Sequence, residues 1–171
     1  RVISLSILRH LDATAEERAA YLKRANAVRR GAAGEVEEAG ADAEEAIGAI
    51  ELGEKRYVEM SEAEQFVLTI AERGYGKRSS SYEYRTTGRG GKGIVAMAVT
   101  SKTGRVVASF PVEDQDQLVL VTNGGQLIRT RVEGIRIVGR STQGVIVFDT
   151  AEDERVVSVE RIGEEGEENG G

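Results

Sequence analysis

The sequence predicts a mainly β protein of propeller-like blades, and an internal repeat with a period near 50 residues is the main observation behind this prediction. A glycine-rich loop at residues 88–93 precedes an apolar run at 94–99, and a related loop at 139–144 precedes the run at 145–148. Each period has room for about four short strands, which is typical of blades arranged around an axis.

Two further stretches repeat in the same order. Phe-Val-Leu-Thr at Phe66 matches Leu-Val-Leu-Val at Leu118 with an offset of 52 residues, and Arg-Val-Val at Arg105 recurs at Arg155 with an offset of 50. Alternating and β-branched residues between glycine turns predict the strands of the first unit at 66–70, 77–84, 94–99 and 105–112. We therefore expect a blade over 66–112, a second blade over 113–162, and an acidic disordered tail over 163–171.

The first eight residues alternate apolar and small polar side chains, which is the period of a half-buried strand. Because they resemble the runs at Arg105 and Arg155, we expect residues 1–8 to be the last strand of a preceding blade. The chain starts inside this pattern and without a methionine, which favours a piece of a longer protein.

Residues 9–65 are expected to form a helical and low-complexity acidic insertion between the two units. A helix is predicted over 18–30, where Thr14 and Glu17 have the spacing of a capping box and Gly31 provides a stop. Residues 31–52 have almost nothing to bury and predict a disordered acidic linker or a loosely helical insertion, with an acidic regulatory arm that competes with nucleic acid for the basic centre as the alternative. A short helical turn is expected over 53–64, with Ser61 and Glu64 at capping-box spacing.

Charge is distributed unevenly along the chain. Residues 66–150 carry 12 Lys and Arg against 7 Asp and Glu, whereas the remainder carries 11 against 22, although the net charge is -6. A basic centre flanked by acidic segments suits a polyanionic partner better than the total charge indicates.

Several classes of chemistry are disfavoured. The chain has no cysteine and a single histidine, His10, so nucleophile–base pairs and transition-metal sites are nearly excluded, and we expect no catalytic residue and no metal ligand. Residues 88–93 formally match a dinucleotide fingerprint, but a strand-like run follows them instead of a helix. They also fail as a Walker loop, because Gly93 follows Lys92. No apolar run is long enough for a membrane span.

Cations that recur in both units are the candidate binding residues. Equivalent positions in radial repeats face the same way, so we expect these cations to line an outer rim that contacts the phosphates of duplex DNA. The alternative is an ordinary solvated strand face. Aromatic residues are scarce, which favours a duplex over a single strand, and no recognition helix is evident. The predicted DNA-binding residues are Lys77, Arg78, Arg85, Arg89, Lys92, Arg129, Arg131, Arg136 and Arg140.

Four stretches carry a resemblance to a known family. They are Glu-Arg-Gly-Tyr-Gly-Lys-Arg at 72–78, Tyr-Arg-Thr-Thr-Gly-Arg-Gly-Gly-Lys-Gly-Ile at 84–94, Leu-Ile-Arg-Thr-Arg-Val at 127–132 and Gly-Arg-Ser-Thr-Gln-Gly-Val at 139–145. In this order and at this spacing, residues 66–162 resemble two consecutive blades of the C-terminal domain of the bacterial DNA gyrase A subunit.

The resemblance implies a β-pinwheel, a propeller-like disc whose basic rim wraps duplex DNA without regard to sequence. It implies a parent protein that is a type IIA DNA topoisomerase, supercoils DNA negatively at the expense of ATP, and forms a heterotetramer with the gyrase B subunit. ATP and Mg would then bind elsewhere, no cofactor would bind this chain, and the location would be cytoplasmic and nucleoid-associated. The alternatives are the related domain of topoisomerase IV and a blade-type protein-interaction scaffold that does not bind DNA.

Overall fold

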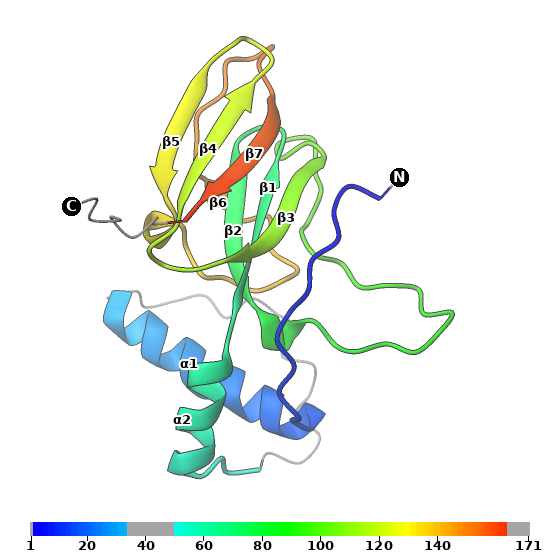
Figure 1. Ribbon diagram of the computed structural model, residues 1–171, viewed down its shortest axis with the longest axis vertical. Coiled ribbons are helices and arrows are strands. Elements are labelled where there is room, and N and C mark those ends of the chain that lie inside the picture. Colours follow the sequence, from blue (N-terminus) through cyan, green and yellow to red (C-terminus); the bar gives the residue numbers. More distant parts are fainter. Residues whose placement is uncertain (1, 34–49, 164–171) are drawn as a thin grey trace, which may run out of the picture.

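The computed structural model describes residues 2–33 and 50–163, which form two antiparallel sheets and a pair of helices (Figure 1). The predicted mainly β fold is confirmed. The acidic stretch at 34–49 and the tail at 164–171 lie outside the described residues. In chain order the elements are α1 (Ala15–Ala33), α2 (Glu54–Ala63), β1 (Phe66–Ala71), β2 (Tyr75–Ser80), the 3-10 turn η1 (Ser81–Glu83), β3 (Val106–Val112), β4 (Gln117–Thr122), β5 (Leu127–Arg131), the 3-10 turn η2 (Val132–Gly134), β6 (Val145–Ile146) and β7 (Val156–Ile162).

The two sheets have related topologies. The first has the order β3-β1-β2-β6 and the second the order β5-β4-β7, so each is built on a hairpin whose first strand also pairs with the last strand of its repeat. The fourth strand of the first sheet, β6, comes from the second repeat and pairs with β2 at Tyr75 and Gly76. A strand donated by the next unit therefore completes the first blade.

The register of the hairpins corrects one detail of the sequence repeat. Phe66 pairs with Ser80 in the first sheet, and Gln117 pairs with Arg131 in the second, so β1 and β4 are related by an offset of 51 residues. The sequence match of Phe66 with Leu118 is thus one residue out of register. Both strands are apolar over most of their length, so similarity alone could not distinguish the two alignments, although a one-residue slip exchanges the faces of a strand.

The main core lies between the two sheets. Leu68 and Ile70 of β1 pack with Leu118 and Leu120 of β4 in one buried cluster that also contains Val156 of β7. With an offset of 51, Leu68 corresponds to Val119 and not to Leu118, so the two sheets present opposite faces to each other. Stacking of this kind is what successive blades of a propeller require, because each unit covers one face of the preceding one.

Two predicted strands do not form. Within the described residues, 2–14 and 84–105 contain no helix or strand, so the strands expected at 1–8 and 94–99 are absent. The reason is visible in β6, which is the repeat counterpart of residues 94–95 and finds its partner in the preceding unit. Residues 94–95 have no preceding unit to pair with in this part of the chain. Residues 2–8 contact β3 through the Ser4 hydroxyl, which donates to the carbonyl oxygen of Ser109, while Leu5 is 94% exposed.

The helical segment begins at the predicted capping box but differs from the prediction at two other points. The capping box at the start of α1 is confirmed, since the Thr14 amide donates to Glu17 Oε2 at 2.9 Å and the Glu17 amide to Thr14 Oγ1 at 3.1 Å. The helix continues past Gly31, and Ser61 lies inside α2, so the predicted stop and the second capping box are wrong.

The two helices share a small core of their own. Tyr21 and Ala25 of α1 pack with Met60 of α2, and Tyr57 and Tyr82 close this cluster. Tyr82 belongs to η1, and its hydroxyl donates to the carbonyl oxygen of Met60 at 2.7 Å. The two helices therefore pack against η1, which precedes the first glycine-rich loop in the sequence.

Candidate nucleic-acid interface

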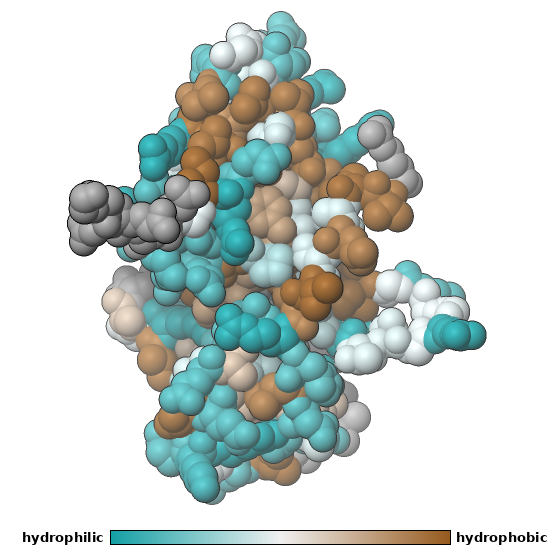
Figure 2. Space-filling view, in the orientation of Figure 1, coloured by the Kyte–Doolittle hydropathy of each residue, from teal (hydrophilic) through white to brown (hydrophobic). Residues whose placement is uncertain are grey.

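The first glycine-rich loop carries three exposed cations. Arg85, Arg89 and Lys92 all lie in the exposed stretch that follows η1. This stretch stands away from the sheets (Figure 1), and its outer part is hydrophilic to neutral (Figure 2). Gly90 and Gly93 have φ values of +78° and +74°, a backbone conformation that L side chains adopt at a cost. The loop thus presents cations and bare backbone to solvent.

Arg140, from the second glycine-rich loop, contacts the chain on both sides of the first. Its Nε donates to the carbonyl oxygen of Glu83 at 3.1 Å, its amide donates to Glu83 Oε1 at 3.0 Å, and its Nη1 donates to the carbonyl oxygen of Val95. The amide of Ala98 also donates to the carbonyl oxygen of Thr142 at 3.1 Å. These contacts join the second glycine-rich loop to the segments that flank the first one. We call Arg85, Arg89, Lys92 and Arg140 the glycine-loop surface.

Lys77 was predicted to lie on the exposed rim, and the structure buries it completely. Its Nζ donates to the carbonyl oxygens of Gly139 at 2.9 Å, Thr142 at 2.8 Å and Arg140. Burial lowers the pKa of this ammonium to about 8; the Glu83 carboxylate acts in the opposite direction, and the positive charge of Arg140 lowers the pKa further. Lys77 supports the second loop from inside the protein.

Arg78 is also buried, contrary to the prediction of an exposed cation. Its Nε donates to the carbonyl oxygen of Ile135 at 2.7 Å, its Nη2 donates to that of Glu133 at 3.2 Å, and its Nη1 pairs with Asp114. Every one of these partners belongs to the second unit or to its connection. Arg78 therefore joins the two blades.

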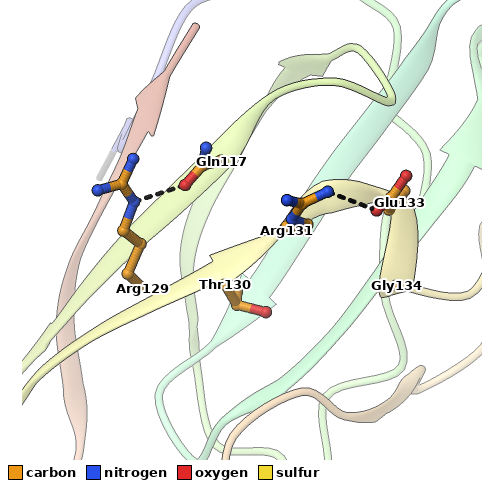
Figure 3. A pocket seen from close by; sticks show the side chains of 6 residues that line it. All are labelled: Gln117, Arg129, Thr130, Arg131, Glu133 and Gly134. Carbon is orange, nitrogen blue, oxygen red and sulfur yellow. Dashed lines mark hydrogen bonds and ion pairs between the residues drawn. The ribbon is translucent and has the colours of Figure 1, made fainter. Parts of the chain in front are cut away.

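The cations of β5 lie on another part of the molecule. Arg129 and Arg131 are exposed and line an open depression with Gln117, Thr130, Glu133 and Gly134 (Figure 3). Arg129 Nε donates to Gln117 Oε1 at 2.5 Å, and Arg131 Nη1 lies 3.2 Å from Glu133 Oε1. Figure 1 shows β5 on the opposite side of the molecule from the first glycine-rich loop. Arg136 is exposed, and its carbonyl oxygen accepts the Arg78 amide at 2.9 Å. The nine predicted residues thus do not form one row.

Glu83 is the residue of this region that the sequence did not reveal. It lies on η1, and burial raises the pKa of its carboxyl group against the opposing effect of the Arg140 amide and of the Lys77 and Arg140 charges. Its repeat counterpart is Gly134, so a comparison of the two repeats does not single out this position. A signal for Lys77 did exist, because its counterpart at an offset of 51 is Ile128, an apolar strand residue.

Two negative findings apply to residues 2–33 and 50–163 only. No three His, Asp or Glu side chains gather there in a way that could hold a metal ion. In the same ranges, neither helix has the length and hydropathy that a bilayer span requires.

The fold is that of a propeller-like blade protein. Its two sheets are stacked, the second repeat donates β6 to the first sheet, and the basic glycine-rich loops lie where the two repeats meet. A family model described as "DNA gyrase C-terminal domain, beta-propeller" matches residues 65–113 and 116–162. The chain belongs to this family.

Sequence relatives agree with the family match. The chain is 48% identical to the DNA gyrase A subunit of Granulibacter bethesdensis over 165 residues, which is 92% of this chain and 18% of the relative. It is 43% identical to that of Rickettsia prowazekii over 170 residues, 97% of this chain and 18% of the relative. For the Escherichia coli protein the identity is 49% over 98 residues, 57% of this chain and 11% of the relative. The chain therefore spans about a fifth of the length of the first two.

Solved structures support the fold. A structure of a DNA gyrase A C-terminal domain matches with a TM-score of 0.53 and 27% identity, over 56% of this chain and 33% of that one. The C-terminal domain of a DNA topoisomerase IV matches with the same TM-score at 24% identity, over 58% of this chain and 31% of that one, which supports the fold alone.

Proposed function

We propose that this chain is the DNA-binding portion of a gyrase A protein and that the glycine-loop surface binds the phosphates of duplex DNA. One observation carries the proposal: residues 84–112 contain five Lys and Arg and no Asp or Glu. Three of these cations, Arg85, Arg89 and Lys92, are exposed in one stretch, and Arg140 of the next repeat donates to carbonyl oxygens at both ends of it, those of Glu83 and Val95. Adjacent cations release the counterions of a phosphate backbone, which is the main source of sequence-independent affinity.

The loop backbone adds a second contribution. Because Gly88, Gly90 and Gly93 have no atom within 4 Å of an ideal Cβ position, a phosphate can approach the main-chain amides closely. No helix of the described chain lies in this surface, so the contacts would position a duplex without reading its bases.

The wider function follows from membership of the gyrase family. In this proposal the chain helps to wrap duplex DNA, so that the parent type IIA topoisomerase, in a heterotetramer with the gyrase B subunit, supercoils DNA negatively at the expense of ATP. ATP and Mg would bind outside this chain, and the protein would work on the nucleoid in the cytoplasm. The relatives that are DNA gyrase A subunits support this proposal, and the matching DNA topoisomerase IV domain remains the alternative.

A protein-docking role is the second candidate, and it applies to the depression around Arg129 and Arg131. The corresponding face of the first sheet, which carries Arg78, is covered by the second unit. On the second sheet, Leu127 is 68% exposed, and apolar side chains gather over β4, β5 and β7 (Figure 2). A further blade of the parent protein fits this face better than DNA does, because a duplex gains nothing from an apolar surface.

The salt dependence of duplex binding tests the first proposal. If the four cations of the glycine-loop surface contact phosphates, the slope of log K against log[salt] should be between about -3 and -4 for two unrelated duplexes. Replacing Arg89 and Lys92 together by alanine should weaken binding by about tenfold or more and reduce the magnitude of the slope by about 2. Fluorescence anisotropy titrations measure both quantities.

The matched control is the double replacement of Lys23 and Arg30, two exposed cations of α1, by alanine. It removes the same charge from a surface outside the proposed interface and should leave the slope nearly unchanged. Equal losses for the two double variants would refute the glycine-loop surface as the binding site. Replacing Arg129 and Arg131 tests the second candidate, which predicts unchanged DNA affinity.

A further inference from the structure

The Lys77 ammonium occupies a cage formed by the chain that follows it by more than 60 residues. Three carbonyl oxygens accept from its Nζ, and all three belong to the second glycine-rich loop, at Gly139, Arg140 and Thr142. A lysine ammonium has three donors, so the cage satisfies its full hydrogen-bonding capacity. Lys77 is 0% exposed, and residues 139–142 that cover it are half-buried.

The cage explains why the loop turns as it does. The amide of Thr142 donates to the carbonyl oxygen of Gly139 at 3.2 Å, and the Thr142 hydroxyl donates to the same oxygen at 2.8 Å, which closes a tight turn. This turn aims several carbonyl dipoles at one point inside the protein. Without a cation there, the Gly139 oxygen would keep its bonds from Thr142 and the Thr142 oxygen its bond from the Ala98 amide, but all three oxygens would lose a charged donor. The turn would therefore lose part of its preference for this conformation.

Arg140 lies in the middle of the caged turn. Its carbonyl oxygen faces Lys77, while its guanidinium donates outward to the carbonyl oxygens of Glu83 and Val95. Its side chain can therefore keep its place beside the first loop only while the turn keeps its shape. Lys77 sits on β2 of the first unit, so one blade sets the geometry of a cation in the next.

The two repeats differ at this point. Ile128 stands where Lys77 stands in the first unit, so no second lysine cage exists at the equivalent place on β5. The first loop, at residues 88–93, is exposed throughout, and open space surrounds the Cβ positions of Gly88, Gly90 and Gly93 within the described residues. The caged loop is thus held in place by a contact that its counterpart lacks in this part of the chain.

We propose that Lys77 is a positioning residue for DNA binding, which holds Arg140 in the glycine-loop surface by caging the turn at residues 139–142, without touching DNA itself. The proposal rests on the proposed function, because it assigns a role to a residue behind that surface. It makes the affinity of the glycine-loop surface depend on a buried side chain of the neighbouring blade.

The protonation state of Lys77 gives DNA affinity a pH dependence that a purely structural role would not produce. With the pKa lowered to about 8, chiefly by burial, the Lys77 ammonium loses its proton in the folded chain well below the value of 10.5 that applies to the unfolded chain. The groups that face it are Glu83 on η1 and Arg140 on the loop. Thr69 of β1 lies opposite it in the sheet, and the half-buried Tyr84 lies beside Thr69 and Ser79.

The expected pH dependence of the free energy of unfolding is opposite in sign to the expected pH dependence of DNA affinity. Between pH 8 and 10.5 the unfolded chain binds more protons at this lysine than the folded chain, so this group contributes a rise in stability with increasing pH. A neutral amine has only two hydrogens for three carbonyl oxygens, so the cage weakens over the same interval. A loss of DNA affinity there would thus arise from the loop and not from the unfolding of this site.

The experiment compares Lys77→Met, a similar-sized side chain without charge, with the exposed control Lys23→Met in the full chain. Anisotropy titrations with one duplex at about pH 7 and about pH 9, together with hydrogen exchange of residues 139–144, give two independent readouts. We expect Lys77→Met to weaken binding by about tenfold at neutral pH, to accelerate exchange in the loop, and to bind with little pH dependence. The wild type and Lys23→Met should lose affinity between the two pH values.

The outcomes are distinguishable. If the wild type does not bind DNA, the proposed function fails, and the exchange measurement still decides whether Lys77 holds the loop. If the wild type binds and Lys77→Met binds as tightly as the wild type at about pH 7, with the same loss of affinity at about pH 9, the positioning role is wrong. If Lys77→Met does not fold, Arg140→Ala decides: the pH-dependent loss of affinity should disappear in it, and an unchanged loss would overturn the proposal.

Discussion

Gly74→Ala is expected to destabilise the protein by about 3–5 kcal/mol, which is at the upper end of single-substitution effects. Gly74 has a φ of +80°, and a Cβ there would lie 1.9 Å from the carbonyl oxygen of Phe148. The backbone amides of Val147 and Phe148 donate to the Gly74 carbonyl oxygen at 2.9 and 3.2 Å, so the second unit cannot move away without losing these bonds. Positive φ alone accounts for only about 1 kcal/mol.

The repeat supplies the control for this prediction. Gly125 occupies the same hairpin position 51 residues later, with a φ of +82°, and has no atom within 4 Å of its Cβ position. Gly125→Ala should therefore cost about 1 kcal/mol, the conformational part of the effect. Urea unfolding followed by circular dichroism measures both free energies of unfolding. Equal losses would show that close packing of the two units at Gly74 contributes nothing to stability.

Arg78→Ala is expected to destabilise the protein by about 2–4 kcal/mol. The guanidinium side chain is 6% exposed, and its removal leaves the carbonyl oxygens of Ile135 and Glu133 without their donor at the junction of the blades. It also opens a cavity against Phe66, whose ring centroid lies 5.8 Å from the guanidinium carbon. The loss should be measurable as a lower midpoint of urea unfolding.

Two control substitutions separate the contribution of the buried Arg78 hydrogen bonds to stability from that of its ion pair. Arg129 is the repeat counterpart of Arg78 and is exposed, so Arg129→Ala should change the free energy of unfolding by less than about 0.5 kcal/mol. Asp114, the ionic partner of Arg78, is 70% exposed, and Asp114→Ala should cost no more than about 1 kcal/mol. If Asp114→Ala were as harmful as Arg78→Ala, the ion pair and not the carbonyl contacts would hold the blades together.

Local sequence signals predicted part of the local structure. The capping box of Thr14 and Glu17 marks the true start of α1, because both hydrogen bonds form within one turn of chain. Alternating residues before a glycine turn located the hairpin of β1 and β2, whereas the strand at 94–99 that would pair across the turn at Gly104 does not form. These features depend on residues that are neighbours along the chain.

The position of each cation could not be predicted in this way. Equivalence within the repeat suggested that Arg78 and Arg129 face the same surroundings, yet the second unit covers one and leaves the other exposed. Residues 94–99 have the composition of a strand and form none, since a strand of this kind needs an edge from the preceding unit. For Lys77 the apolar repeat counterpart Ile128 was the one signal of burial that we found, and it did not show that the loop at 139–142 folds over the lysine.

Alternating residues and turn residues were sufficient to establish the β class of this protein, and a capping box the start of its first helix, because these signals act through short-range contacts. Which cations are available to a partner, and which hold the blades together, was settled by the packing of the folded chain alone. The physical reason is that burial depends on which surface is stacked on which, and that contact joins residues 50 or more positions apart.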